Sequence, residues 1–181
     1  MKHAIAVDGG NSKTDVALVR EDGEVVATAR GGGSSPQHLG VEGSLAVIGA
    51  LLDQVRDGLP VDAAELLLAG VDFPAEEQAV RAGIEERGWA RNVSVDNDTF
   101  AVLRAGTDAG WGVAVVCGAG INCVGVAPDG RQARFRALGW TTGDWGGGAE
   151  VGREAVWAAA RSEDGRGPKT VLERLVPAHF G

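Results

Sequence analysis

The sequence predicts an α/β fold in which one unit, three β-strands followed by helical segments, occurs twice along the chain. Three observations support this prediction. Short apolar runs of strand length alternate with longer segments that have helical periodicity. The dipeptide Asp22-Gly23 is a strong hairpin signal between the second and third runs. The same order of three runs and a helix begins again near Gly110.

The first unit is predicted as βββαβαβα. Strands are expected at residues 3–8, 14–20, 24–30, within 63–72, and at 92–97. Helices are expected at residues 41–58, 73–88 and 99–106. In the first of these helices the apolar residues at 41, 45, 48, 51, 52 and 55 have the spacing of one helix face. Pro74 and Gly88 mark the start and the end of the second helix.

The second unit is predicted as βββα followed by one more short helix. Residues 111–139 contain a strand, a glycine-rich turn, a second strand, the turn PDGR and a third strand. A helix is expected over 147–161 and a shorter one within 170–181. We place the boundary at residues 108–110, so that 1–108 form a first lobe and 109–181 form the first part of a second.

The composition is that of an ordinary globular protein, with 181 residues of which 44% are hydrophobic and 23% are charged. The net charge of −8 argues against partners such as nucleic acid or an acidic membrane surface. No run of about 20 apolar residues is present that would cross a membrane. Cys117 and Cys123 lack the C-x-x-C spacing of a metal or redox site, and we expect a cytoplasmic protein.

Glycine is the compositional outlier, with 29 residues, about twice the usual share of roughly 7%. The glycines gather beside strand-like runs, at 9–10, 31–33, 118 and 120, and within 143–148. Because glycine has no Cβ, backbone amides in such turns can approach an anion closely. We interpret AVDGGNSKTDVALV, residues 6–19, as a phosphate-binding hairpin. Asp8 repels phosphate directly, so its place there is explained by a Mg²⁺ ion, usually bound through water.

Two commoner nucleotide motifs are excluded by their context. A P-loop requires G-x-x-x-x-G-K-[ST], but Lys13 follows Ser12 and Lys169 follows Pro168. A Rossmann fingerprint requires G-x-G-x-x-G at the start of a helix, whereas GAGINC leads into a strand. Two glycine-rich turns, each in a βββ unit, are better explained as two hairpin loops that face each other across a cleft.

A family resemblance rests on these loops. The pair AVDGGNSKTDVALV and VAVVCGAGINCVGV resembles the phosphate 1 and phosphate 2 motifs of the actin-like sugar kinase and Hsp70 superfamily. More narrowly, the chain resembles the BadF/BadG/BcrA/BcrD ATPase family, which includes the N-acetylglucosamine kinases. GGGSSPQHLG resembles that family's sugar-contacting loop, SVDNDTFAVLRAG its acidic strand-end segment, and LGWTTGDWGGGAEVGREAV its Gly-Asp segment before a helix. The resemblance implies an actin-like ATPase fold, which is ribonuclease H-like.

The resemblance also implies cofactors and site residues. ATP and Mg²⁺ would be the cofactors, with Asp8 holding the metal through water. The β- and γ-phosphates would be cradled by Gly9, Gly10, Asn11, Ser12, Lys13 and Thr14, and a second phosphate loop would be formed by Gly118, Ala119 and Gly120. Asp98 would be the general base that takes a proton from the acceptor hydroxyl. The sugar would be contacted by Ser34, Ser35, Asn122 and Asp144.

Several assignments keep an alternative. Asp96 competes with Asp98 for the role of base, and Asp98 also suits the cap of the helix that starts at Thr99. Asp144 also suits a helix cap. The chain departs from the family pattern at Ala119, where the kinases have Thr or Ser, and at Ser35-Pro36, where they have Asn near this position. The Gly-Asp segment is also shorter between Trp140 and Asp144 than in the animal enzymes. These departures leave the identity of the sugar open.

The predicted function is therefore ATP-dependent phosphorylation of a hydroxyl of N-acetylglucosamine, glucosamine or a related amino sugar. Alternatives are a BadF-type ATPase that acts on a partner enzyme, and a non-catalytic binding fragment. The two cysteines flank the second phosphate loop, which argues against an iron-sulfur activator. The second lobe lacks its later strands and the adenosine segment, so we expect the 181-residue chain to be inactive by itself. We also expect it to dimerise through the incomplete lobe or to have a mobile second lobe.

Overall fold

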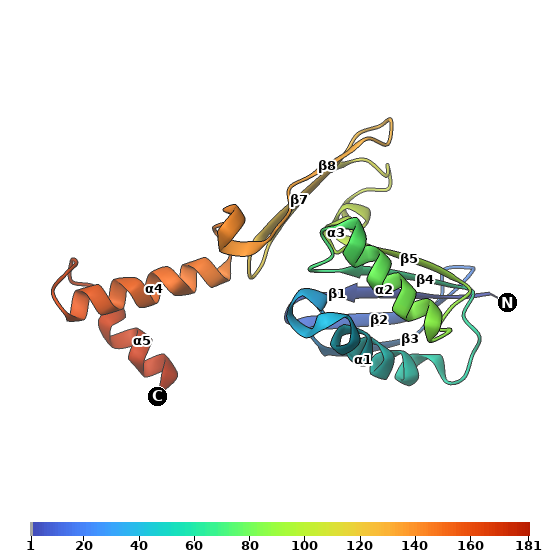
Figure 1. Ribbon diagram of the computed structural model, residues 1–181, viewed down its shortest axis with the longest axis horizontal. Helices are drawn as coiled ribbons and strands as arrows, with labels where there is room; N and C mark the ends of the chain where they lie inside the picture. Colours follow the sequence, from blue (N-terminus) through green and yellow to red (C-terminus); the bar gives the residue numbers. More distant parts are fainter. Residues whose placement is uncertain (1) are drawn as a thin grey trace. The chain divides into compact units, whose positions relative to one another are not determined.

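The computed structural model describes residues 2–181 (Figure 1). The elements of the first repeat are β1 His3–Gly9, β2 Lys13–Arg20, β3 Val25–Gly32, α1 Pro36–Arg56, β4 Ala63–Leu68, α2 Pro74–Glu86, β5 Asn92–Asn97 and α3 Thr99–Gly106. Those of the second repeat are β6 Gly112–Cys117, β7 Ile121–Val126, β8 Gln132–Arg134, the 3₁₀ turn η1 Gly139–Thr142, α4 Gly148–Glu163 and α5 Leu172–Phe180. The predicted order of strands and helices is confirmed in both repeats.

The first repeat forms one five-stranded sheet in the order β3-β2-β1-β4-β5. β1 and β3 are antiparallel to β2, and β4 lies parallel to both β1 and β5. The two hairpins follow from short turns, whereas each parallel pair requires a helical crossover. The register aligns Gly9 with Leu68 and Leu68 with Asn97. The carboxyl ends of β1, β4 and β5 therefore meet at one edge of the sheet.

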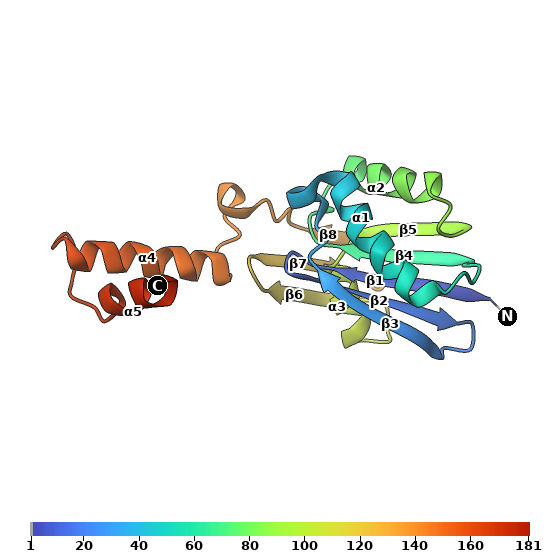
Figure 2. The same cartoon turned by 90° about the horizontal axis from the view of Figure 1, so that it is seen from below.

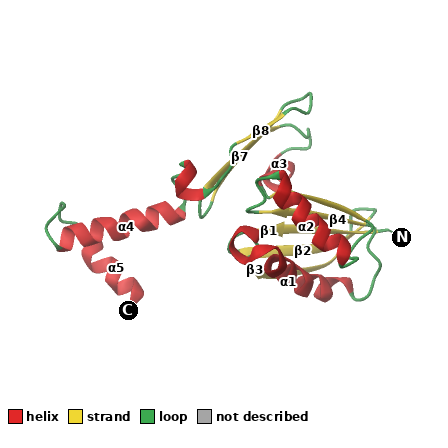
Figure 3. Cartoon of the chain, in the orientation of Figure 1, coloured by secondary structure: helices red, strands yellow, loops and turns green. Residues whose placement is uncertain are grey.

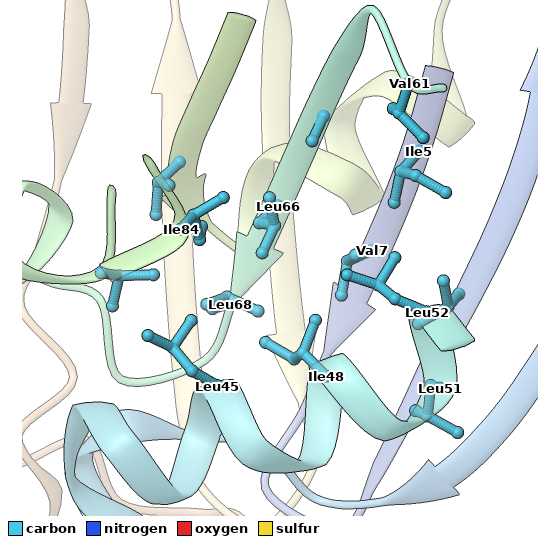
Figure 4. Close-up of a cluster of buried hydrophobic side chains, with 14 of the residues drawn as sticks. Ile5, Val7, Leu45, Ile48, Leu51, Leu52, Val61, Leu66, Leu68 and Ile84 are labelled. Atoms are coloured by element: carbon cyan, nitrogen blue, oxygen red, sulfur yellow. The ribbon is translucent and has the colours of Figure 1, made fainter. Parts of the chain in front are cut away.

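The core lies between this sheet and the helices α1 and α2, which cover the same face (Figure 4). Alternate residues of the strands, such as Val7 and Leu68, point into it, and α1 contributes a stripe at the predicted helical spacing that includes Leu45 and Ile48. α3 lies on the other face of the sheet (Figure 2), where its Ala101 shares a hollow with residues of β1 and β2.

Most elements begin and end within two residues of the expected positions, and the larger differences concern α1 and the third strand of the second repeat. α1 begins at Pro36 and not at residue 41, because one turn of helix precedes a kink at Gly40, whose φ of 70° is left-handed. Such a backbone is easily adopted only by glycine. In the second repeat, the third strand has only three residues, and a separate short turn, η1, follows it.

The chain forms two compact units (Figure 3). The first extends to Val115 and also includes Cys123–Arg136, which holds most of β7 and all of β8. The second consists of Val116–Asn122 and Ala137–Gly181, so the turn between β6 and β7 belongs with α4 and α5. Within it, α4 and α5 are tied by Ser162, whose hydroxyl donates to Glu173 at 2.7 Å. The division into lobes at residues 108–110 stays a prediction.

Among residues 2–181, no helix has both the length and the apolar character that a membrane span requires.

Shortening one buried side chain of this core should destabilise the protein. Ile48→Ala, at a fully buried position, should lower the free energy of unfolding by about 2–5 kcal/mol, because it removes apolar contacts and leaves a cavity. Urea denaturation measures this loss. Leu39→Ala, in the exposed turn before the kink, is the matched control and should change stability by less than about 0.5 kcal/mol. Equal effects of the two substitutions would contradict the assigned core.

Candidate functional site

The parallel strands bring acidic side chains to one edge of the first sheet. Asp8, Leu67 and Asp96 lie side by side in the register, and their side chains share the face opposite to α1 and α2. Asp98 directly follows β5, and Asp72 lies in the loop between β4 and α2. The charges of Asp8 and Asp72 both act on Asp98. Four carboxylates therefore surround the ends of three neighbouring strands.

Burial and neighbouring negative charge strongly alter the protonation of Asp98. Its pKa is raised to about 6, first by burial and then by the negative charges of Asp8 and Asp72, while the backbone amides of Thr99 and Asp98 oppose the rise. Asp98 is the N-cap residue of α3 but makes no side-chain capping hydrogen bond, and the amide of Thr99 donates to Asn97 Oδ1 at 3.0 Å. A carboxylate with a pKa close to neutrality suits a general base.

Asp96, the alternative base, is held by hydrogen bonds within the protein. Its Oδ1 accepts the amide of Asn97 at 2.7 Å and a guanidinium N–H of Arg134 at 3.4 Å. These two contacts engage the Asp96 carboxylate within the protein. The geometry therefore favours Asp98 over Asp96.

Asp72 was missed by the sequence analysis, although it is buried within the acidic group with an exposed fraction of only 4%. Its Oδ1 lies 3.3 Å from Asn97 Nδ2, which also donates to the carbonyl of Val71. A signal was present, because the run LLLAGVD places an acid shortly after a parallel strand, as VDGG and VDND do. Its burial next to Asp98 depends on the conformation of the loop after β4, which sequence patterns do not specify.

Asp8 has the surroundings expected of a carboxylate that binds a hydrated Mg²⁺ ion. It is exposed at the end of β1 and lines a hollow of about 630 Å³ on the open face of the sheet. Its carboxyl group is still partly shielded from water, and this partial burial together with the charge of Asp15 raises its pKa, while the charge of Lys13 opposes the rise. In residues 2–181, no three His, Cys, Asp or Glu side chains form a metal-binding group of their own. Mg²⁺ commonly takes only one or two carboxylates, with water and phosphate oxygens, so a lone Asp8 fits it.

The first glycine loop is held close to the chain segment after β3. The Gly10 amide donates to Lys13 O at 2.8 Å, and the Ser34 amide donates to Gly10 O at 3.1 Å. A Cβ on Gly33 would lie 2.2 Å from Asn11 O, so this close approach requires glycine. Within the described residues 2–181, the amides of Asn11 and Ser12 donate to no carbonyl of the protein. They are suitable donors for a phosphate oxygen.

The polar side chains near this loop are divided between buried and exposed positions. Thr14 is buried and donates its hydroxyl to Ser34 Oγ at 2.8 Å, and Ser34 is likewise buried. Lys13 is exposed, with its Nζ 3.6 Å from Asp15. Ser35 is buried, and its hydroxyl is without a hydrogen-bond partner among residues 2–181. The assigned roles of these four side chains in ligand binding stay predictions.

The second glycine loop, in the second unit, is bonded to the amino end of α4. Gly148 N donates to Gly118 O at 2.8 Å, and Ala149 N donates to Ala119 O at 2.9 Å. In a trans peptide the N–H points away from the C=O, so the amides of Ala119 and Gly120 point away from α4. The first amides of α4 therefore bind the loop itself.

The predicted sugar contacts of the second unit lie close to this loop. Asp144 is buried and accepts the amide of Gly139 at 3.0 Å and the hydroxyl of Thr142 at 3.3 Å, so its carboxylate closes the η1 turn. It does not cap α4, because the N-cap there is Gly147. Asn122 lies in β7, directly after the loop. The indole rings of Trp140 and Trp145 are exposed and stack at 4.8 Å.

Two curated relatives extend over nearly the whole chain. The N-acetylmuramic acid/N-acetylglucosamine kinase of Clostridium acetobutylicum is 30% identical over an alignment of 181 positions, which covers 96% of this chain and 58% of that protein. The N-acetyl-D-glucosamine kinase of Dictyostelium discoideum is 27% identical and is matched over the same 58% of its length. The chain therefore spans somewhat more than half the length of the curated relatives it matches.

Solved structures share the fold. A protein from Chromobacterium violaceum, proposed to be an N-acetylglucosamine kinase, has a TM-score of 0.79 and 26% identity, over 100% of this chain and 65% of that one. A ROK family glucokinase from Streptomyces griseus has a TM-score of 0.58 and 21% identity, over 90% of this chain and 62% of that one. The predicted actin-like sugar kinase fold is thereby confirmed.

The family profile matches almost the whole chain, from residue 5 to residue 178. It includes both glycine loops, the acidic strand ends and α4. The chain belongs to the BadF/BadG/BcrA/BcrD ATPase family.

Proposed function

We propose that the full-length protein transfers the γ-phosphoryl group of ATP to a hydroxyl of N-acetylglucosamine or a related amino sugar, with Asp98 as the general base. The observation that carries the proposal is the contrast between two neighbouring carboxylates. Asp98 has a pKa raised to about 6, whereas Asp96 is paired with Arg134. The substrate class rests on the names of the two curated relatives, both of which are N-acetylglucosamine kinases.

The chemical step needs a hydroxyl that is deprotonated as it attacks phosphorus. Asp98 accepts this proton, and its raised pKa makes it a stronger base than an ordinary aspartate. The oxygen then forms the new bond to the γ-phosphorus while the bond from phosphorus to the β-γ bridging oxygen breaks, which releases ADP. Catalysis otherwise consists of positioning and charge stabilisation.

Each glycine loop has backbone amides that suit a phosphate oxygen. In the first unit these are the amides of Asn11 and Ser12, and in the second they are those of Ala119 and Gly120. Asp8 would hold Mg²⁺ through water, and the metal when bound would neutralise charge on the phosphate oxygens. On the sugar side, Ser35 offers a buried hydroxyl whose hydrogen-bonding capacity is unused within residues 2–181. Asn122 and Asp144 are the corresponding candidates in the second unit.

The first prediction concerns the identity of the base. Asp98→Asn in the full-length protein should lower kcat by about 10²–10⁴-fold, because it removes the proton acceptor and keeps the side-chain shape. Asp96→Asn is the matched control and should retain more activity, since Asp96 makes structural hydrogen bonds. An ATP-coupled assay with N-acetylglucosamine measures both. Full turnover in Asp98→Asn together with loss in Asp96→Asn would show that the base is Asp96.

The second prediction concerns pH. A base must be unprotonated to act, so kcat/KM should be level above the Asp98 pKa of about 6 and should fall as the pH decreases through it. The fall should approach about tenfold per pH unit well below this pKa. The same titration of Asp98→Asn should lack this acidic limb in its residual rate. A wild-type profile that stays level down to pH 4.5 would rule out a base with this pKa.

The third prediction concerns Asp8. Asp8→Asn should raise the Mg²⁺ concentration needed for half-maximal turnover by about tenfold or more, because a carboxylate ligand is lost. Sugar affinity measured by calorimetry in Mg²⁺-free buffer should stay unchanged. Asp15→Asn, on the same sheet face but paired with Arg30, is the control and should leave the Mg²⁺ requirement as in the wild type. An equal loss of sugar affinity in Asp8→Asn would contradict the metal role.

A further inference from the structure

Arg134, in β8, joins the second repeat to the acidic edge of the first sheet. β8 pairs with β7, and its residue Arg134 lies opposite Val124. The Arg134 side chain is mostly buried, with an exposed fraction of 18%. All of its partners belong to the first compact unit, which includes β8 itself. The sequence analysis assigned no role to this residue.

The guanidinium fork makes contacts in two directions. One terminal nitrogen, Nη2, donates to the backbone carbonyl of Asp72 at 2.9 Å and lies 3.5 Å from Glu77 Oε1. The other, Nη1, donates to Asp96 Oδ1 at 3.4 Å. The group also lies over the ring of Phe100 in α3, 6.0 Å from its centroid. One side chain thereby fastens the β4–α2 loop to the end of β5.

The β4–α2 loop and the end of β5, which Arg134 connects, are the segments that surround Asp98. The side chain of Asn97 donates to Asp72 Oδ1 and to the carbonyl of Val71, and it accepts the hydroxyl of Thr99. Asn97 and Thr99 are the chain neighbours of Asp98 on either side. A second cation of the same segment supports the attachment, since Arg136 stacks over Phe73 at 4.6 Å. The position of Asp98 therefore depends on a frame that Arg134 closes.

Charge makes this frame necessary. Asp8, Asp72, Asp96 and Asp98 lie around the same strand ends, and the repulsion among them opposes a compact arrangement. Arg134 is a cation placed against this group, and a buried guanidinium that makes several hydrogen bonds holds carboxylates more rigidly than an ammonium group does.

We propose that Arg134 is a positioning residue, which holds the β4–α2 loop and the end of β5 so that the Asp98 carboxylate is directed at the acceptor hydroxyl. The inference rests on the proposed function in that Asp98 is taken as the base. The position of Asp98, in the first repeat, would thus depend on Arg134, a residue of the second repeat. Arg134 itself need not touch the substrate.

The test is a double-mutant cycle in the full-length protein, assayed with ATP and N-acetylglucosamine. Arg134→Gln should lower kcat by about 10- to 100-fold, since a misplacement of about 1 Å can cost this much, and KM for ATP should change by less than about twofold. Arg134→Lys should recover only part of the loss, because one ammonium cannot reproduce the fork. In the Asp98→Asn background, Arg134→Gln should cause no further loss, because its effect passes through Asp98.

Arg131→Gln is the matched control. Arg131 lies at the exposed tip of the same hairpin, and its side chain pairs with Asp129, so this variant should have wild-type kcat. Equal kcat for Arg134→Gln and Arg131→Gln would overturn the proposal. So would a full additive loss in the Asp98→Asn background, which would indicate general damage to the structure. A wild-type protein that phosphorylates no amino sugar would instead overturn the proposed function.

Hydrogen exchange provides a readout that does not depend on activity. In Arg134→Gln, the amides of residues 70–77 should exchange faster than in the wild type, while those of the core strand β2 should be unchanged. Unchanged exchange at 70–77 would show that Arg134 does not hold this loop and would overturn the positioning role even in an active enzyme.

Discussion

The parallel alignment of β1, β4 and β5 is the constraint on which the site depends. Because Gly9, Leu68 and Asn97 lie side by side, three chain segments that are far apart in sequence end at the same edge of the sheet. The first glycine loop, Asp72 and Asp98 all follow these ends. Burial of one sheet face under α1 and α2 maintains the register, since a shift by one residue would move Val7 and Leu68 out of the core. The core thus positions the carboxylates without contacting most of them.

Four neighbouring carboxylates repel one another, and the surroundings of Asp96 and Asp98 respond to this repulsion differently. Asp96 is paired with Arg134, whereas Asp98 is left with a raised pKa beside two other negative charges. Asp96 therefore makes structural contacts, whereas Asp98 has the properties expected of the proposed base. The difference arises from β8, a strand of only three residues in the second repeat. Within the first compact unit, a side chain of the second repeat, Arg134, therefore contacts the acidic segments of the first repeat.

The second unit shows another use of internal hydrogen bonds. The amino end of α4 binds the carbonyls of Gly118 and Ala119 and so directs the loop amides away from the helix. Gly147 allows this approach, because a Cβ there would lie 2.4 Å from Ala119 O. Asp144 closes the preceding turn in the same unit. In the first loop the corresponding support comes from Ser34 and Thr14. Both loops are thus held by hydrogen bonds from neighbouring residues, so the proposed binding of phosphate would cost less conformational entropy.

The sequence by itself determined the order of elements, the two glycine loops and the acidic end of β5, because turn residues and apolar periodicity are local signals. It also identified the family through motifs that agree with that order. It did not separate Asp98 from Asp96, find Asp72, or assign a role to Arg134. Those outcomes depend on contacts between residues up to 62 positions apart, such as Arg134 with Asp72. Burial, pKa and ion pairing arise from such long-range contacts, and only the tertiary structure decided them.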